Sequence, residues 1–542
     1  MGNVRFKKMA LYLAVLAIIA AVSIPLGGVS SHAAQGDAAP VELVVALTLE
    51  PRSLDPAYNY EFASYHVVNH INEGLLYYTP DSRLANGLAE SWEQADATTY
   101  VYRIRQGVRF SDGSPLTVED VLFSLERIKD PALAADTNWM YSSVDTIKQT
   151  GEWEITVKLN KPDANWKYVL ATSAGEIVSK KFVEAAGDSF GKPGGGTLGT
   201  GPYKLDKWVP GSQFVLSRNE HYWNKKENFP IDKVTVNIIP DMNSVGLALE
   251  SGQADFFIRP SKEILAQFEG SKKFKIVTSP SLGNAVVSFN TKKSPFDDAN
   301  VRKAVASAID SAGIRKSQVG EYAADAGALP FGEKGYTIGD FEDWKKFNAS
   351  LPLYSYDMEK AKRYLAQSSV PKGFSTSIIL RPNQSHNNIA QIIQASLKEL
   401  NIGVEVRQLT ASEYYGYVYG GKITNGIRDY DMSINLWIPD FPDPIGHLIP
   451  QYYSTNAGAG GSNFAAYSNP KVDALCDEQS LSADDNERSK LIQRAFAIAA
   501  EESPYKYLFY DNNTIIINKK FDYALSPVWI FNFSYKDIKL AE

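Results

Sequence analysis

Cysteine is almost absent from this sequence. Among 542 residues only Cys476 carries a thiol, and histidine occurs 6 times. One thiol cannot form a disulfide within the chain, and it rules out a zinc site built on several cysteines. The sequence also has no G-x-x-x-x-G-K-[ST] phosphate loop, and no G-x-G-x-x-G follows a strand. We therefore expect no metal, no cofactor and no nucleotide hydrolysis in this chain.

An excess of positive charge is also lacking. The chain has 55 Lys and Arg against 62 Asp and Glu, for a net charge of −7 at pH 7. A nucleic-acid-binding domain presents a basic face, so we expect no nucleic-acid partner. The composition is otherwise that of an ordinary globular protein, with 44% hydrophobic and 22% charged residues.

Long apolar runs are missing except near the N-terminus. There, basic residues at positions 5, 7 and 8 precede an apolar run over 11–22, and Ser31-His32-Ala33 ends in a small residue. This layout predicts a signal peptide over 1–33, cut after Ala33. An uncleaved anchor is the alternative, although the run is shorter than the about 20 residues that a membrane span needs. Since no cysteine follows the cut, we expect an exported periplasmic or extracellular protein without a lipid anchor.

Strand and helix patterns alternate along the rest of the chain. Tyr100, Tyr102 and Ile104 alternate with other residues as in a half-buried strand, whereas 301–309 and 491–499 show the spacing of one buried helix face. These patterns predict an α/β fold. The chain is also too long for one hydrophobic core, because single cores stop growing near about 250–300 residues.

Two patterns resemble catalytic or metal sites. The segment 187–191 (GDSFG) matches G-x-S-x-G, but residues before Ser189 read as a helix, whereas a nucleophile elbow needs a strand there. His66 and His70 are four residues apart, yet Val67 stands where a zincin has its glutamate. We expect neither a hydrolase nor a metal site, and we interpret Ser189 and the histidines as structural.

Several short segments, spread along the whole chain, carry most of the information about the class of protein. They are 53–56 (SLDP), 72–76 (NEGLL), 87–92 (GLAESW), 105–117 (RQGVRFSDGSPLT), 124–127 (SLER), 199–203 (GTGPY), 219–223 (NEHYW), 249–255 (LESGQAD), 289–291 (FNT), 301–304 (VRKA), 357–365 (DMEKAKRYL) and 437–444 (WIPDFPDP).

Together these segments resemble the extracytoplasmic solute-binding proteins of ABC importers, in the group with dipeptide-, oligopeptide- and nickel-binding members. The resemblance covers nearly the whole chain after the signal peptide. It implies a two-lobed periplasmic-binding-protein (Venus-flytrap) fold, with two strands crossing between the lobes and an extra α/β subdomain inserted in the first lobe. A glycine-rich stretch over 191–201 is a candidate for a flexible crossing.

The resemblance also implies a domain layout. The first lobe would comprise 41–80, 198–283 and 502–542, the inserted subdomain 81–197 and the second lobe 284–501. The protein would capture a peptide in the cleft by hinge closure and, as a monomer, deliver it to membrane permease subunits served by separate ATPase subunits.

By the same resemblance, Asp440 would pair with the α-amino group of a peptide, with Leu436 and Trp437 as walls of the pocket. Arg381 follows a predicted strand, where a guanidinium suits a peptide carboxylate. Tyr58, Asn59 and Tyr60 would pair with the peptide main chain.

Alternatives remain open at this point. Asp440 is equally suited to capping a turn before Pro442, and Trp437 to a place in the core. Oligosaccharides would stack on the abundant aromatic rings, and a nickel chelate would call on His66, His70 or His386.

Overall fold

The structure is a computed structural model that describes residues 40–59, 61–81, 83–227, 229–419, 423–424, 427–525 and 533–542. The predicted signal peptide over 1–33 and Tyr60 lie outside the described residues. In the described part, no helix is both long and apolar enough to cross a membrane.

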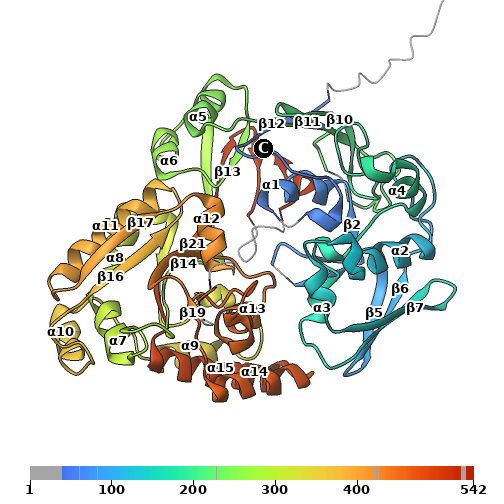
Figure 1. Cartoon of the computed structure of the whole chain (residues 1–542). Helices are drawn as coiled ribbons and strands as arrows, with labels where there is room; N and C mark the ends of the chain where they lie inside the picture. Colours follow the sequence, from blue (N-terminus) through green and yellow to red (C-terminus); the bar gives the residue numbers. More distant parts are fainter. Residues whose placement is uncertain are drawn as a thin grey trace, which may run out of the picture. The chain divides into compact units, whose positions relative to one another are not determined.

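Two long strands link the halves of the molecule, as predicted. Strands β14 (Phe274–Phe289) and β21 (Tyr505–Asn518) pair antiparallel along most of their length, near the centre of Figure 1. Their register shifts between Pro280 and Asn284, the point at which the sheet passes from one lobe to the other.

These two strands lie in the middle of an 11-stranded sheet. Its order is β10 (Tyr203–Val209), β11 (Gln213–Arg218), β12 (Lys233–Ile238), β1 (Glu42–Leu47), β13 (Phe256–Ile258), β21, β14, β20 (Met432–Trp437), β16 (Ser375–Leu380) and β17 (Gly403–Gln408), while β15 (Ala323–Asp325) pairs with β21.

Side chains of the first lobe fill a core on each face of this sheet, because successive residues of a strand point to opposite faces. In β1, Val45 packs in one core and Ala46 in the other. The helices of this lobe are α1 (Phe62–Tyr65), α5 (Met242–Ser251) and α6 (Lys262–Phe268).

The second lobe repeats this two-faced arrangement. Val286 and Val287 of β14 enter different cores, and the helical pattern predicted over 301–309 forms α7. Its helices are α7 (Ala299–Ala308), α8 (Ser311–Gln318), α9 (Phe341–Ser350), α10 (Met358–Ala366), α11 (Gln384–Lys398), α12 (Ala411–Val418), α13 (Ile445–Tyr452), α14 (Pro470–Leu481) and α15 (Asp485–Glu502).

A separate four-stranded sheet forms the inserted subdomain, which has its own core. Tyr100, Tyr102 and Ile104 are buried, which confirms the strand predicted there. The order is β5 (Ala89–Asp96), β6 (Thr99–Ile104), β8 (Glu154–Leu159) and β7 (Val144–Gly151), with helices α2 (Val118–Lys129), α3 (Trp166–Val169) and α4 (Lys180–Ala186). The residue limits of the two lobes and of the inserted subdomain stay predictions.

Several of the family-like segments meet in space. Glu73 accepts hydrogen bonds from Thr200 Oγ1 at 3.0 Å, Trp223 Nε1 at 2.8 Å and Tyr222 OH at 3.2 Å. These residues come from three of the motif segments, 72–76, 199–203 and 219–223. The motifs therefore serve the fold of the first lobe.

The glycine-rich stretch 191–201 does not cross between lobes, which corrects that prediction. A Cβ on Gly191 would lie 2.5 Å from the Asp55 backbone nitrogen, and one on Gly199 would lie 2.1 Å from the Ile71 carbonyl. The glycines are needed for close packing inside the first lobe rather than for hinge rotation.

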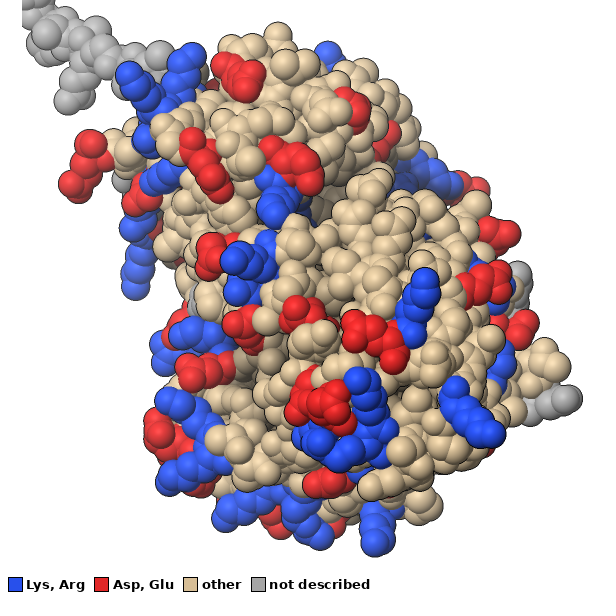
Figure 2. All heavy atoms as spheres, turned by 90° about the vertical axis from the view of Figure 1, so that its left-hand side faces the viewer, with Lys and Arg blue, Asp and Glu red and all other residues tan. Residues whose placement is uncertain are grey.

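Charge on the outer face is mixed in sign. Figure 2 shows basic and acidic side chains interspersed over the face that carries α10 and α11, rather than gathered by sign. A surface of this kind favours solubility over recognition of a polyanion.

Candidate functional site

The loop after β20 passes from the second lobe into the inserted subdomain. Phe441 in this loop is 4% exposed and belongs to the subdomain's core, with its ring 5.9 Å from that of Tyr168 on α3. A residue of the second lobe therefore packs inside the inserted subdomain, so the loop holds these two parts in contact.

Buried charges strengthen this contact. The Tyr168 hydroxyl donates to Asp443 Oδ2 at 2.9 Å, and Arg488 on α15 approaches the same oxygen at 3.1 Å. Lys167 on α3 contacts Asp485 on α15 at 3.0 Å. Hydrogen bonds to charged groups are about twice as strong as neutral ones, so these bonds favour the contact between α3 and the second lobe.

Asp440 lies in the same loop, half-buried between the lobes. Burial raises the pKa of Tyr65 and Tyr78 in the first lobe, and the Asp440 charge raises the pKa of both phenols further. On the side of the second lobe, burial, Tyr415 and then Asp440 raise the pKa of Tyr419 to about 12. The Asp440 charge therefore reaches tyrosines of both lobes.

An aromatic wall runs beside Asp440; we use this name for Tyr415, Tyr419, Phe464 and Trp437. Ring centroids are 5.9 Å apart for Tyr415 and Tyr419, 5.4 Å for Tyr419 and Phe464, and 6.0 Å for Phe464 and Trp437. Tyr415 and Tyr419 are 44% and 38% exposed, so part of the wall faces solvent. Large rings of this kind bind apolar or flat parts of a ligand.

Arg381 lies at the far end of the aromatic wall. Its Nη1 donates to Tyr415 OH at 2.9 Å, and its guanidinium lies 5.8 Å from the centre of that ring. Tyr419 responds to both charges, since Asp440 raises its pKa and Arg381 lowers it. A carboxylate and a guanidinium thus flank one wall, an arrangement that suits a ligand with an ammonium at one end and a carboxylate at the other.

Leu436 does not join this wall. It points to the opposite face of β20 from Trp437, because side chains alternate along a strand. There Leu436, Ala285 and Phe509 line a cavity of about 690 Å³. Its other lining residues include Arg259 of the first lobe and His386 of the second, so this cavity also lies between the lobes.

Trp437 itself serves the core as well as the wall. It is 8% exposed and packs in one core of the second lobe, as the alternative interpretation held. The core interpretation is confirmed, and the ring also contacts Phe464, while a role in a ligand pocket stays a prediction.

Tyr58 and Asn59, which were predicted to pair with the main chain of a peptide, make hydrogen bonds within the protein. Tyr58 OH donates to the Leu133 carbonyl at 2.7 Å, and Asn59 Nδ2 donates to Asn69 at 3.1 Å. The backbone N–H groups of Tyr58 and Asn59 donate to the Asp55 and Pro56 carbonyls. Pairing of this loop with a ligand main chain stays a prediction, and Tyr60 lies outside the described residues.

Two of the three histidines considered for a chelate, His66 and His70, lie away from the cavity that His386 lines. His66 and His70 are 1% and 0% exposed inside the first lobe, and the His70 ring stacks 4.0 Å from Tyr535. Burial lowers the pKa of His66 to about 3. In the described part of the chain no three metal-binding side chains converge.

Ser189 lacks the surroundings of a nucleophile. It ends a short 3-10 turn (Gly187–Ser189) that directly follows α4, and its hydroxyl donates to the Ala186 carbonyl at 2.6 Å. A nucleophile elbow requires a strand before the serine, so the pattern at 187–191 is coincidental.

Sequence reasoning missed Tyr415, Tyr419 and Phe464. One signal was present, because 414–419 carries four tyrosines in six residues on and beside α12. Phe464 lies in a loop, and no local pattern marks it as a neighbour of Trp437.

Comparisons with known proteins agree with this architecture. The family model described as bacterial extracellular solute-binding proteins, family 5 Middle, matches residues 83–459. The probable D,D-dipeptide-binding periplasmic protein DdpA of Escherichia coli K12 is 28% identical over 491 residues, covering 88% of this chain and 90% of that protein. The glutathione-binding protein GsiB of the same strain is 27% identical over 507 residues, covering 92% and 94%.

Solved structures share the fold. The periplasmic binding protein DppA of Helicobacter pylori, in complex with the peptide STSA, is 25% identical and has a TM-score of 0.77, with 92% of this chain and 98% of that chain covered. The oligopeptide-binding protein AppA of Bacillus subtilis, in complex with a nonapeptide, is 24% identical with a TM-score of 0.73, covering 93% and 100%. The family match spans more than half of the chain, and the two-lobed fold agrees with it. This chain therefore belongs to the bacterial extracellular solute-binding proteins of family 5.

Proposed function

We propose that this protein is the substrate-binding component of an ABC importer and that it captures peptides with a free α-amino group between its lobes. The family membership supports the transport role. Relatives named for dipeptide and glutathione binding, and a structural relative in complex with a peptide, support the class of ligand.

The position of Asp440 carries the proposal. Its charge acts on Tyr65 and Tyr78 of the first lobe and on Tyr419 of the second, so a cation beside it would contact both lobes. A buried ammonium requires an opposite charge with hydrogen bonds, and Asp440 supplies that charge. Arg381, at the other end of the aromatic wall, would receive the carboxylate.

Closure would couple binding to transport. A ligand that contacts both lobes binds the closed form better than the open one, and so shifts the population toward closure. The closed form would then be what the permease subunits recognise. We include export without a lipid anchor and a monomeric state in this proposal, on the basis of the predicted signal peptide and the periplasmic relatives.

Calorimetric titration of Asp440→Asn tests the proposal. The peptide Ser-Thr-Ser-Ala should bind the variant about 30-fold more weakly than wild type, because removing one partner of a buried charge pair costs about 2–5 kcal/mol. The N-acetylated peptide has no ammonium, so its affinity should be nearly the same for both proteins.

The exposed Asp188→Asn is a matched control that should leave both affinities unchanged. A coupling energy near zero in this double-mutant cycle would remove Asp440 from the site. If peptides and glutathione fail to bind wild type while an oligosaccharide binds, the ligand assignment fails and the transport role stands.

A further inference from the structure

A second pocket, of about 450 Å³, lies away from the aromatic wall. Its lining residues all fall within 65–227 and 533–537, so they come from the first lobe, the inserted subdomain and the C-terminal segment. The second lobe contributes none of the described lining residues. Its volume is within the range of about 300–1,000 Å³ that is typical of small-molecule sites.

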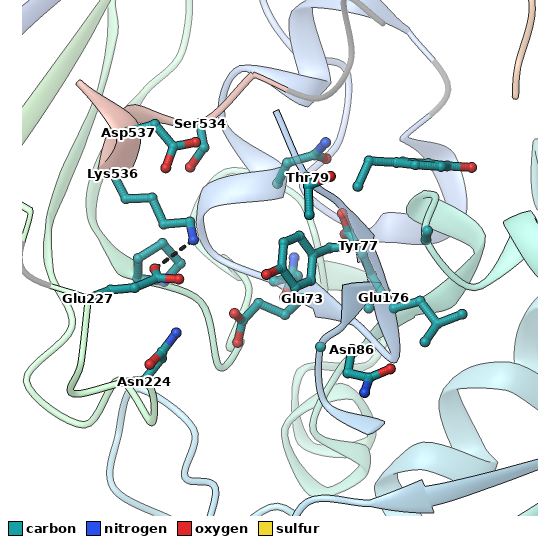
Figure 3. Close-up of a pocket in the computed structure, with 18 of the residues that line it drawn as sticks. Glu73, Tyr77, Thr79, Asn86, Glu176, Asn224, Glu227, Ser534, Lys536 and Asp537 are labelled. Atoms are coloured by element: carbon teal, nitrogen blue, oxygen red, sulfur yellow. Dashed lines mark hydrogen bonds and ion pairs between the residues drawn. The ribbon is translucent and has the colours of Figure 1, made fainter. Parts of the chain in front are cut away.

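Two carboxyl groups on paired strands form one wall of this pocket. Glu73 on β2 (Glu73–Gly74) is held by the three hydrogen bonds described above, and Glu176 on β9 (Glu176–Ile177) pairs with Gly74. Figure 3 shows Glu73, Tyr77 and Glu176 together, across from Lys536 and Glu227. Glu176 is 7% exposed, and its Oε2 has no hydrogen-bond partner among the described residues.

When no cation lies beside Glu176, its surroundings disfavour the charged form of its carboxyl group. Burial raises the pKa of Glu176 well above its usual range, and the charges of Asp55 and Glu73 raise it further. Asp55 is already paired with Arg127 at 2.7 Å, and Tyr65 on α1 presents only a neutral phenol. Burial also raises the pKa of Glu73 to about 7. The empty pocket therefore favours the neutral form of Glu176 more than water does.

The chain itself shows how this pocket holds an ammonium. Lys536 Nζ contacts Glu227 Oε2 at 2.6 Å and lies 5.8 Å from the centre of the Tyr77 ring. A carboxylate and an aromatic face thus bind one ammonium on this side of the pocket. The opposite side has the same two elements, Glu176 and the ring of Tyr65, with no ion pair to Glu176 among the described residues.

We propose that this pocket is a second binding site, for a primary amine with an aromatic or apolar body. The carboxylate of Glu176 would receive the ammonium. The body of the amine would contact the rings of the lining, which are Tyr65, Tyr77, Tyr78, Tyr222, Trp223 and Phe533. Since the second lobe contributes none of the described lining residues, binding would need no closure.

Isothermal titration of 2-phenylethylammonium into the whole protein at pH 7 tests this inference. We expect saturable binding, at least tenfold tighter than that of 2-phenylethanol or phenylacetate, which have the same body with no charge or the opposite charge. Glu176→Gln should weaken binding at least tenfold.

Matched variants keep the test decisive. Glu93→Gln, at an exposed position on β5, should bind like wild type. If Glu176→Gln does not fold, Tyr77→Ala at a 41% exposed position should also weaken binding. Equal binding of the alcohol, or no binding to wild type, would overturn the inference. Competition with Ser-Thr-Ser-Ala would also overturn it, because the pocket would then be part of the peptide site.

Discussion

At the scale of single residues, β20 shows that neighbours in the sequence can lie in different parts of the structure. Leu436 and Trp437 are adjacent, and the sequence resemblance assigned both to one pocket wall. Strand alternation sends their side chains to opposite faces of the sheet, Leu436 to the cavity of about 690 Å³ and Trp437 to the aromatic wall. Asp440, three residues beyond the strand, has neighbours in both lobes that only the folded chain reveals.

His66 makes the first prediction, which concerns pH. The imidazole is buried against Phe62, at 4.6 Å, and burial lowers its pKa from an ordinary value of 6.5 to about 3. The unfolded chain therefore binds the proton first as pH falls below 6.5, and folding stability drops toward pH 3. His66→Leu cannot titrate, so it should lose about 2 kcal/mol less than wild type between pH 7 and pH 5.

Urea denaturation of both proteins at the two pH values measures this difference. Equal losses of unfolding free energy in wild type and in His66→Leu would contradict the assigned burial.

At the scale of helices and strands, the sequence predicts the features that depend on residues close together in the chain. Asp357 caps α10 by accepting from the Lys360 N–H at 2.9 Å, and Thr117 and Asp120 form a capping box at the start of α2. The strand alternation at 99–104 is confirmed for the same reason, since burial on one face imposes period two. The prediction that the stretch 191–201 is a flexible crossing was wrong. Its glycines approach Asp55 and Ile71, which are far away in the sequence, and no local pattern indicates such a contact.

The contact between α3 and the second lobe gives the second prediction. Tyr168→Phe removes the hydroxyl that donates to buried Asp443 while keeping the ring that stacks on Phe441. Hydrogen bonds to charged groups contribute about 1.5–3 kcal/mol, and this one joins the inserted subdomain to the second lobe. Peptide affinity should therefore fall about tenfold, although Tyr168 lies outside the aromatic wall.

Tyr141→Phe is a suitable control for calorimetry. Its hydroxyl donates to the Ala174 carbonyl at 2.7 Å inside the subdomain, so its loss should affect stability and leave affinity unchanged. An unaltered affinity in Tyr168→Phe would show that this contact does not contribute to closure.

At the scale of the whole molecule, the two-lobed fold was predicted from the resemblance, and the two crossing strands confirm it. The geometry of the site was not predictable to the same extent. The aromatic wall joins residues from 415 to 464, and the tyrosines that the Asp440 charge reaches include one as far away in the sequence as Tyr65. Such contacts are set by how the lobes pack, and no spacing in the sequence encodes them.

The central claim is that a peptide is captured by closure of the lobes around its ammonium. Small-angle scattering of the wild-type protein, with and without saturating Ser-Thr-Ser-Ala, tests it most directly. We predict a smaller radius of gyration with the free peptide and no change with the N-acetylated peptide at the same concentration. A radius of gyration that stays constant while calorimetry shows the free peptide to be bound would contradict the account.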